Sequence, residues 1–358
     1  MKLYFSRASI TLRWALLIFS SILFSILLNL GHFPAAILLG CMFAAILISI
    51  RSGPLHISRP DFALAQGIVG CLMARSLQPQ VLNGVIDNWM LFVGISLSVF
   101  ATSVLLGWFF MRRGIFPGST AVWGLAPGAA AAMVVMAESY GADVRLVAFM
   151  QYLRVAMTTV IAAAIAHFYA VNNGTNMHLP PSWLVVDYTN LLLTITLASG
   201  ISMLAYKLRI PGGSMLLPLM AGVVMQNFGL LIIELPLFLL TIAYAVIGWS
   251  VGLRFNSAIL RHALNSLPQV LFAISALILL SGLMAIGLWK LANYDLFTAY
   301  LATSPGGADS VAVIAATSAV DVGFVMAMQL SRFLFVLIFG PIVSKLVATK
   351  CLKNSALS

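Results

Sequence analysis

The chain has 358 residues, of which 62% are hydrophobic and only 8% are charged. A soluble domain is about 45–50% apolar and about 25% charged, so this composition excludes a water-soluble enzyme or binding module. The formal net charge of +10 does not indicate nucleic acid, because the Lys and Arg residues stand singly or in pairs at the ends of apolar runs, where they signal topology. We therefore predict an all-α polytopic membrane protein whose partner is the lipid bilayer, with no nucleic acid bound.

Apolar runs follow one another through the whole chain, and a spanning helix needs ~20 mostly apolar residues. In chain order, the first half predicts helices at about 14–31, 33–50, 61–76 and 88–111, then a Gly/Ala/Pro segment at 118–140, then a helix at 143–171. The second half predicts helices at about 188–206, 211–228, 236–253 and 266–289, a matching segment at 296–319, and a helix at 321–345.

This similarity between the halves reflects an internal duplication. Residues 120–154 align without a gap on residues 298–332, and 13 of the 35 positions are identical. We therefore predict two membrane repeats, at 1–178 and 179–358. Among the identities are Pro127 with Pro305, Asp143 with Asp321, Gln151 with Gln329, and Arg154 with Arg332.

The orientation of the repeats depends on the two Gly/Ala/Pro segments. Six crossings per half give parallel repeats, whereas five crossings and one returning segment give inverted repeats. Counting both segments as spans would place Lys207, Arg209, Arg254 and Arg261 outside, which the positive-inside rule disfavours. We predict inverted repeats with about ten transmembrane helices, two re-entrant or broken Pro-Gly hairpins and both termini cytoplasmic. Full spans remain the alternative, because 23 residues at ~1.5 Å each also cross a ~30 Å core.

Each segment contains a Pro-Gly break. Pro removes an amide donor and Gly permits unusual backbone angles. In transporters built from inverted repeats, such breaks meet near the midplane and form the substrate and ion site. The alternative is a Pro kink packed by Gly and Ala. The substrate- or ion-binding candidates here are Pro127 and Gly128 in the first segment, and Ser304, Pro305, Gly306 and Gly307 in the second.

Two long helices carry a polar stripe. In the first, Asp143, Gln151 and Arg154 are spaced by eight and three residues, which places them on one helical face. Asp321, Gln329 and Arg332 repeat the spacing. Ionisable residues inside a membrane are costly and mark functional sites, so Gln151, Arg154, Gln329 and Arg332 are binding candidates, and Asp143 and Asp321 are interpreted as a structural polar pair. In the alternative, each Arg merely satisfies hairpin carbonyl groups.

Asp309 distinguishes the two halves, because Ala131 stands at the equivalent place. It follows Pro305-Gly306 in a first helical turn, where negative charge is favoured. It is therefore a candidate for binding a coupling cation, carrying a proton or neutralising Arg154 or Arg332, with a simple helix cap as the alternative. Helix N-termini after both breaks, together with the two arginines, suit an anionic substrate such as a carboxylate.

Nothing in the sequence indicates catalysis. The five histidines show no i,i+4 pair or other close ligand spacing, and Cys41, Cys71 and Cys351 form no CxxC pair. We expect no enzyme activity, no catalytic residues, no metal and no cofactor.

Long strings of the sequence resemble one known family. The strings are Gly118-Ser119-Thr120-Ala121-Val122-Trp123-Gly124 with Pro127-Gly128, Tyr140-Gly141-Ala142-Asp143-Val144-Arg145-Leu146-Val147-Ala148-Phe149-Met150-Gln151-Tyr152-Leu153-Arg154, and Ala299-Tyr300-Leu301-Ala302-Thr303-Ser304-Pro305-Gly306-Gly307. They are similar to the AbrB family of bacterial inner-membrane proteins, and the likeness covers essentially the whole chain. The resemblance implies a duplicated membrane domain, an inner-membrane location and a label as a regulator of gene expression.

The resemblance supplies no substrate. Some members are labelled ammonia monooxygenase, which conflicts with the missing metal ligands, and direct regulation conflicts with the lack of a DNA-binding domain. We therefore expect a secondary transporter that moves a small anionic solute or ion by alternating access. A membrane regulator or sensor that affects gene expression indirectly is the alternative. Assembly into a homo-oligomer is left open.

Overall fold

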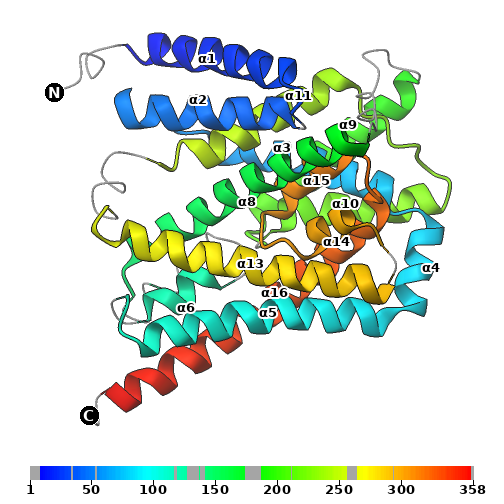
Figure 1. The fold of residues 1–358 in the computed structure, drawn as a ribbon. Helices are drawn as coiled ribbons and strands as arrows, with labels where there is room; N and C mark the ends of the chain where they lie inside the picture. The colour runs from blue at the N-terminus through cyan, green and yellow to red at the C-terminus, as the bar shows by residue number, and fades with distance from the viewer. Residues whose placement is uncertain are drawn as a thin grey trace. The chain divides into compact units, whose positions relative to one another are not determined.

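The computed structural model describes residues 9–33, 35–52, 55–116, 119–126, 137, 142–173, 187–210, 212–255, 264–292 and 294–355. Within them the regular elements are helical, as predicted (Figure 1). The elements are α1 (Ile10–Leu30), α2 (Ala36–Ser52), α3 (Arg59–Ser76), α4 (Pro79–Asp87), α5 (Trp89–Arg112), α6 (Thr120–Leu125), α8 (Val144–Asn173), α9 (Tyr188–Lys207), α10 (Gly213–Asn227), α11 (Leu237–Gly252), η1 (Leu264–Ser266), α13 (Leu267–Ala292), α14 (Leu296–Thr303), α15 (Ala308–Ala316) and α16 (Val322–Ser355).

Most described helices begin and end within a few residues of the predicted runs, but α16 continues to Ser355, well beyond its predicted end at residue 345, and one helix is additional. The helix α4 was not predicted, because Asn83 and Gly84 interrupt a short sequence that follows Pro79. Pro at the first helical position is preorganised for a helix, and the four apolar residues of α4 recur at helical spacing. The segment predicted at 296–319 is two short helices, α14 and α15, which are separated at residues 304–307.

Among the described residues, five helices are long and apolar enough to cross a membrane. They are Ile10–Leu30, Trp89–Arg112, Val144–Tyr169, Tyr188–Lys207 and Leu267–Lys290. The first of them, α1, exposes large apolar side chains such as Phe19 (69% exposed) and Leu30 (71%). Such a surface is stable against lipid tails and not against water. The structure is thus that of a helical protein with several membrane-type helices.

Compact packing divides the chain into two units. Unit 1 contains residues 1–87, 159–256 and 307–327, and unit 2 contains residues 88–158, 257–306 and 328–358. Each unit draws on both halves of the sequence, and each is described here by itself. The predicted repeats at 1–178 and 179–358 are units of duplicated sequence, which this packing does not test, and they stay a prediction.

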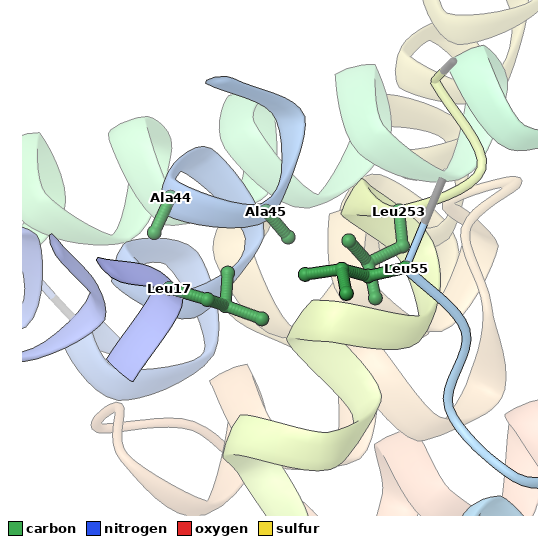
Figure 2. Close-up of a cluster of buried hydrophobic side chains, with 5 residues drawn as sticks. All are labelled: Leu17, Ala44, Ala45, Leu55 and Leu253. Carbon is green, nitrogen blue, oxygen red and sulfur yellow. The ribbon is translucent and has the colours of Figure 1, made fainter. Parts of the chain in front are cut away.

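In unit 1, α1 and α2 pack side by side, and α2 packs in turn on α11. The side chains between them form a buried cluster, in which the largest members are leucines (Figure 2). The small alanines of α2 let the neighbouring helices approach closely, as is common between membrane helices. The members of the cluster are Leu17, Ala44, Ala45, Leu55 and Leu253.

The helix α3 lies among several helices of unit 1 and packs against α9, α10, α11 and α15. Its residues from Val69 to Ala74 are all buried. Yet α3 carries Arg59, Asp61 and Arg75 near its ends and is not among the five helices apolar enough to cross a membrane by themselves. Its place depends on its protein neighbours and not on lipid.

Glycines bring backbones of unit 1 into direct contact. A Cβ on Gly70 of α3 would lie 2.5 Å from the carbonyl oxygen of Met215 in α10. One turn later in α3, Ala74 meets Gly222 of α10, where a Cβ would lie 2.9 Å from Cβ of Ala74. The later residue of α3 contacts the later residue of α10, so α3 and α10 run in the same direction.

The same arrangement joins α11 to α2. A Cβ on Gly248 would lie 2.5 Å from the carbonyl oxygen of Leu38, and one on Gly252 would lie 2.4 Å from the carbonyl oxygen of Met42. Here too the contacts advance together, so α11 and α2 run in the same direction.

In unit 2, α13 packs on both α5 and α14, and α5 packs on α6. A Cβ on Gly107 of α5 would lie 3.0 Å from Cα of Val122 in α6. The helix α16 joins this unit through an apolar cluster of Phe100, Val104 and Val336. These contacts hold the short helices α6 and α14 in place.

We expect Gly70→Ala and Gly248→Ala each to destabilise the protein by about 1–3 kcal/mol, because the new methyl group meets backbone atoms that cannot move aside. Thermal unfolding of purified protein in detergent measures the effect. The matched control is Gly200→Ala in α9, where a Cβ meets nothing within 4 Å. Equal stability of all three variants would contradict the close helix packing.

Candidate functional site

A buried Gln and a buried Arg of α8 bind the end of the short helix α6. Gln151 Nε2 donates to the carbonyl oxygens of Trp123 (2.8 Å) and Ala126 (3.0 Å). Arg154 Nη1 donates to the carbonyl oxygens of Ala126 (3.1 Å) and Leu125 (3.4 Å). The two side chains are joined by a bond from Arg154 Nη2 to Gln151 Oε1 (3.0 Å). We call these contacts the first clamp.

A second clamp joins α16 to the end of α14. Gln329 Nε2 donates to the carbonyl oxygen of Leu301 (2.7 Å). Arg332 donates through Nη1 to the carbonyl oxygen of Ser304 and through Nη2 to that of Gly306 (3.2 Å). Its Nη2 also donates to Gln329 Oε1. Every acceptor in the second clamp is neutral, as in the first.

The two clamps use equivalent residues and equivalent backbone atoms. The carbonyl groups of Trp123 and Ala126 correspond to those of Leu301 and Ser304 at the same offset of 178 that relates the side chains. A helix end exposes carbonyl groups without intrahelical partners, and a buried carbonyl group without a donor costs free energy. Each clamp supplies the missing donors at the point where the short helix stops.

Both clamps lie in unit 2 and are buried. Gln151 and Gln329 are 0% exposed, Arg154 is 4% exposed and Arg332 is 8% exposed. The charge of Arg154 also acts electrostatically on Arg332. Carbonyl dipoles solvate the guanidinium groups but do not cancel their charge. Among the described residues of unit 2, the clamps therefore bring two positive charges together in an apolar environment.

The ends of the first Gly/Ala/Pro segment lie together. The backbone N–H of Asp143, where α8 starts, donates to Thr120 Oγ1 at the start of α6 (3.0 Å). From there α6 and α8 run in the same direction, since the end of α6 meets Gln151 and Arg154. Thr120 and Asp143, at the two ends of the segment, are therefore in direct contact.

Asp143 and Asp321 lie at the starts of the long helices. Asp143 Oδ1 accepts from the backbone N–H groups of Arg145 and Leu146 (both 3.1 Å). Asp321 Oδ1 accepts from the backbone N–H of Phe324 (2.9 Å). In each case a carboxylate satisfies a free donor at a helix N-terminus. These residues therefore have a local structural role at the helix starts.

The remaining candidates lie around the second break or outside the described residues. Pro305 is buried between α14 and α15, and Gly306 is partly buried. Asp309 lies in the first turn of α15, in unit 1, where its Oδ1 accepts from the backbone N–H of Ser310 (2.8 Å). The carboxylate of Asp309 lies close to Gly307, because a Cβ on Gly307 would lie 2.5 Å from Oδ1 of Asp309. Pro127 and Gly128 lie outside the described residues.

Sequence reasoning missed the backbone half of each clamp. Every residue type has a backbone carbonyl group, so Trp123, Leu125 and Leu301 could not be selected from their side chains. Thr120 was also missed as the residue that ties the first segment to α8. Its signal was present, because Thr298 is identical at the equivalent position and both threonines are fully buried.

Comparisons with known proteins cover nearly the whole chain. "Putative regulator AbrB" of Escherichia coli (strain K12) is 44% identical over 345 residues, which are 96% of this chain and 99% of that protein. "Uncharacterized protein YhjN" of Bacillus subtilis (strain 168) is 24% identical over 344 residues, 88% of this chain and 86% of that protein. No solved structure matches the chain.

The family resemblance seen in the sequence is confirmed by this coverage. The family model described as "Transition state regulatory protein AbrB" matches residues 7–348. The chain belongs to the AbrB family.

Proposed function

We propose that the protein is a secondary transporter that moves a small anionic solute across the bacterial inner membrane, by alternating access of two inverted repeats. The observation that carries the proposal is the duplicated clamp, in which a buried Arg and Gln meet the end of a broken helix in each half. Broken helices from two inverted repeats form the substrate sites of many transporters.

The helix directions of unit 1 support the inverted repeats. The helices α3 and α10 run in the same direction, and so do α2 and α11. The six residues between α2 and α3 reach ~20 Å when fully extended, which is too short to cross a ~30 Å core. In a membrane, α3 must therefore run opposite to α2. It follows that α10 runs opposite to α2, its counterpart in the first half.

Contacts around α9 agree with this assignment. Ser214 Oγ at the start of α10 donates to the carbonyl oxygen of Ser202 (3.4 Å), so α10 returns along α9. The connection to α11 stays at the start of α9, where the N–H of Ile232 donates to Asn190 Oδ1 (3.3 Å) and that of Glu234 donates to Thr194 Oγ1 (3.1 Å). The helices α10 and α11 are therefore antiparallel, as the opposite directions of α2 and α10 require.

If the two halves have opposite orientations in the membrane, each repeat must cross it an odd number of times. Five helices cross in each half if the Gly/Ala/Pro segment returns, and the bond between Thr120 and Asp143 favours a returning first segment. From the start of α8 to Arg154, ten residue steps rise ~15 Å, about half of a ~30 Å core. We therefore propose ten crossings, two re-entrant segments and clamps near the midplane.

The positive charge of the clamps favours an anionic solute. Burying an ion costs several kcal/mol even after relaxation, and neutral side chains with N–H donors could satisfy the same carbonyl groups without that cost. A charge retained at such a place is explained by a ligand of opposite charge. Asp309 adds a carboxylate close in sequence to the second break, and we assign it to a coupling cation or proton.

A regulatory role is the second candidate. The family description contains the word "regulatory", and the name of the Escherichia coli relative contains the word "regulator". A membrane sensor uses the same ligand site without net flux and affects gene expression through other proteins. The two functions separate if a regulatory phenotype persists in a variant that has lost flux.

The topology test uses cysteines introduced into a chain whose native cysteines are replaced. We expect His178→Cys, in the segment between α8 and α9 that lies outside the described residues, to react with an impermeant maleimide in intact cells. Leu208→Cys, 61% exposed in the wild type at the end of α9, should react only after permeabilisation, because the positive-inside rule places it in the cytoplasm. The reverse labelling pattern would overturn the inverted arrangement.

The function test is uptake of labelled short-chain mono- and dicarboxylates into proteoliposomes under an imposed proton or sodium gradient. We expect gradient-driven uptake of at least one of them. Arg154→Gln and Arg332→Gln should each lower this uptake at least ~10-fold, since a charge-assisted hydrogen bond is worth roughly 1.5–3 kcal/mol.

The matched control is Arg145→Gln, which removes an exposed Arg from the same helix as Arg154. Uptake by this variant should equal that of the wild type. Wild-type proteoliposomes that take up no carboxylate under either gradient would remove the transporter proposal.

A further inference from the structure

Among the described residues, the first clamp leaves part of its guanidinium group available. A guanidinium has five N–H donors, and the bonds from Arg154 to Leu125, Ala126 and Gln151 occupy at most three of them. Its Nε is buried and has no hydrogen-bond acceptor among the described residues. A donor left unbonded in a buried place costs free energy, so this N–H is suited to an acceptor supplied by a ligand.

Arg332 is in the equivalent position. Its bonds to the carbonyl oxygens of Ser304 and Gly306 and to Gln329 Oε1 also occupy three donors. The neutral acceptors fix each guanidinium plane before a ligand arrives, so little conformational entropy is lost on binding. Both groups are thus preorganised, and the Nε of Arg154 is still able to donate.

Both guanidinium groups are buried in unit 2, and the charge of Arg154 acts on Arg332. Two like charges repel strongly in a medium of low dielectric constant. An anion with one charge neutralises only one of them, whereas an anion with two charges neutralises both. Paired Arg groups also match carboxylate oxygens geometrically, because each guanidinium offers N–H groups in a rigid fork.

We propose that the clamps of Arg154 and Arg332 together bind one small dianion, with a dicarboxylate as the ligand that fits best. This inference rests on the proposed function and narrows its substrate class from anions to dianions. Two separate carboxylates suit the site because the arginines come from two different helices, α8 and α16. A compact inorganic dianion shares the charge but offers it at a single centre.

The test is isothermal titration calorimetry on the purified full-length protein in detergent, with succinate, propionate and sulfate as probes. Succinate and propionate have similar apolar parts and differ in charge, while sulfate has the charge of succinate on one centre. We expect succinate to bind at least ~10-fold more tightly than propionate, since the second carboxylate gains its own charge-assisted bonds. Sulfate binding as tightly as succinate would assign the site to inorganic dianions.

Variants show whether both arginines take part. Succinate affinity should fall at least ~10-fold in Arg154→Gln and in Arg332→Gln, while Arg145→Gln keeps the wild-type value. Because a clamp variant can fail to fold, the wild-type comparison of succinate with propionate stands as an independent measurement. Equal affinity for propionate and succinate, or no binding of any probe, would overturn the dianion site.

Flux separates this inference from the transporter proposal. Wild-type proteoliposomes that take up propionate and succinate equally well under a gradient would refute the dianion preference and leave transport standing. Tight succinate binding without flux under either gradient would refute transport and leave the dianion site standing as that of a sensor.

Discussion

Backbone carbonyl groups exposed by a broken helix must find donors, and this requirement determines the arrangement of unit 2. The ends of α6 and α14 present such carbonyl groups among apolar side chains. In each case Gln and Arg, three residues apart on the adjacent long helix, supply N–H groups to them. Gln bonds only part of the helix end, and Arg completes it at the cost of a buried charge. That charge is what makes the place a candidate site and not merely a helix cap.

The all-helical fold and most helix boundaries could be predicted, because apolar runs and the Pro-Gly breaks mark them directly. The identities at an offset of 178 also selected Gln151, Arg154, Gln329 and Arg332, all of which are buried and paired as equivalent clamps. The helix α4 was missed because its few apolar residues surround Asn83 and Gly84. Carbonyl acceptors such as that of Ala126 were missed because any residue type supplies them. The division of the chain into two packed units follows from contacts between the halves, which no local pattern encodes.

Small residues explain how the halves pack in unit 1. Gly70 and Gly248 are equivalent positions, and each lies against the backbone of a helix from the other half. Close backbone approach gives many dispersion contacts where lipid tails offer no hydrophobic driving force. Larger side chains at these glycines would separate α3 from α10 and α11 from α2. Because α2 and α3 of the first half each pack on a helix of the second half, the second half is necessary for the packing of the first.

The position of α3 has a consequence for biogenesis. Its charged ends and modest hydropathy give it weak affinity for lipid, and three of its main neighbours, α9, α10 and α11, belong to the second half of the chain. Synthesis proceeds from the N-terminus, so α3 leaves the ribosome long before those neighbours exist. In the proposed topology, stable insertion of α3 therefore waits until they are made, and the nascent first half depends on the insertion machinery during that interval.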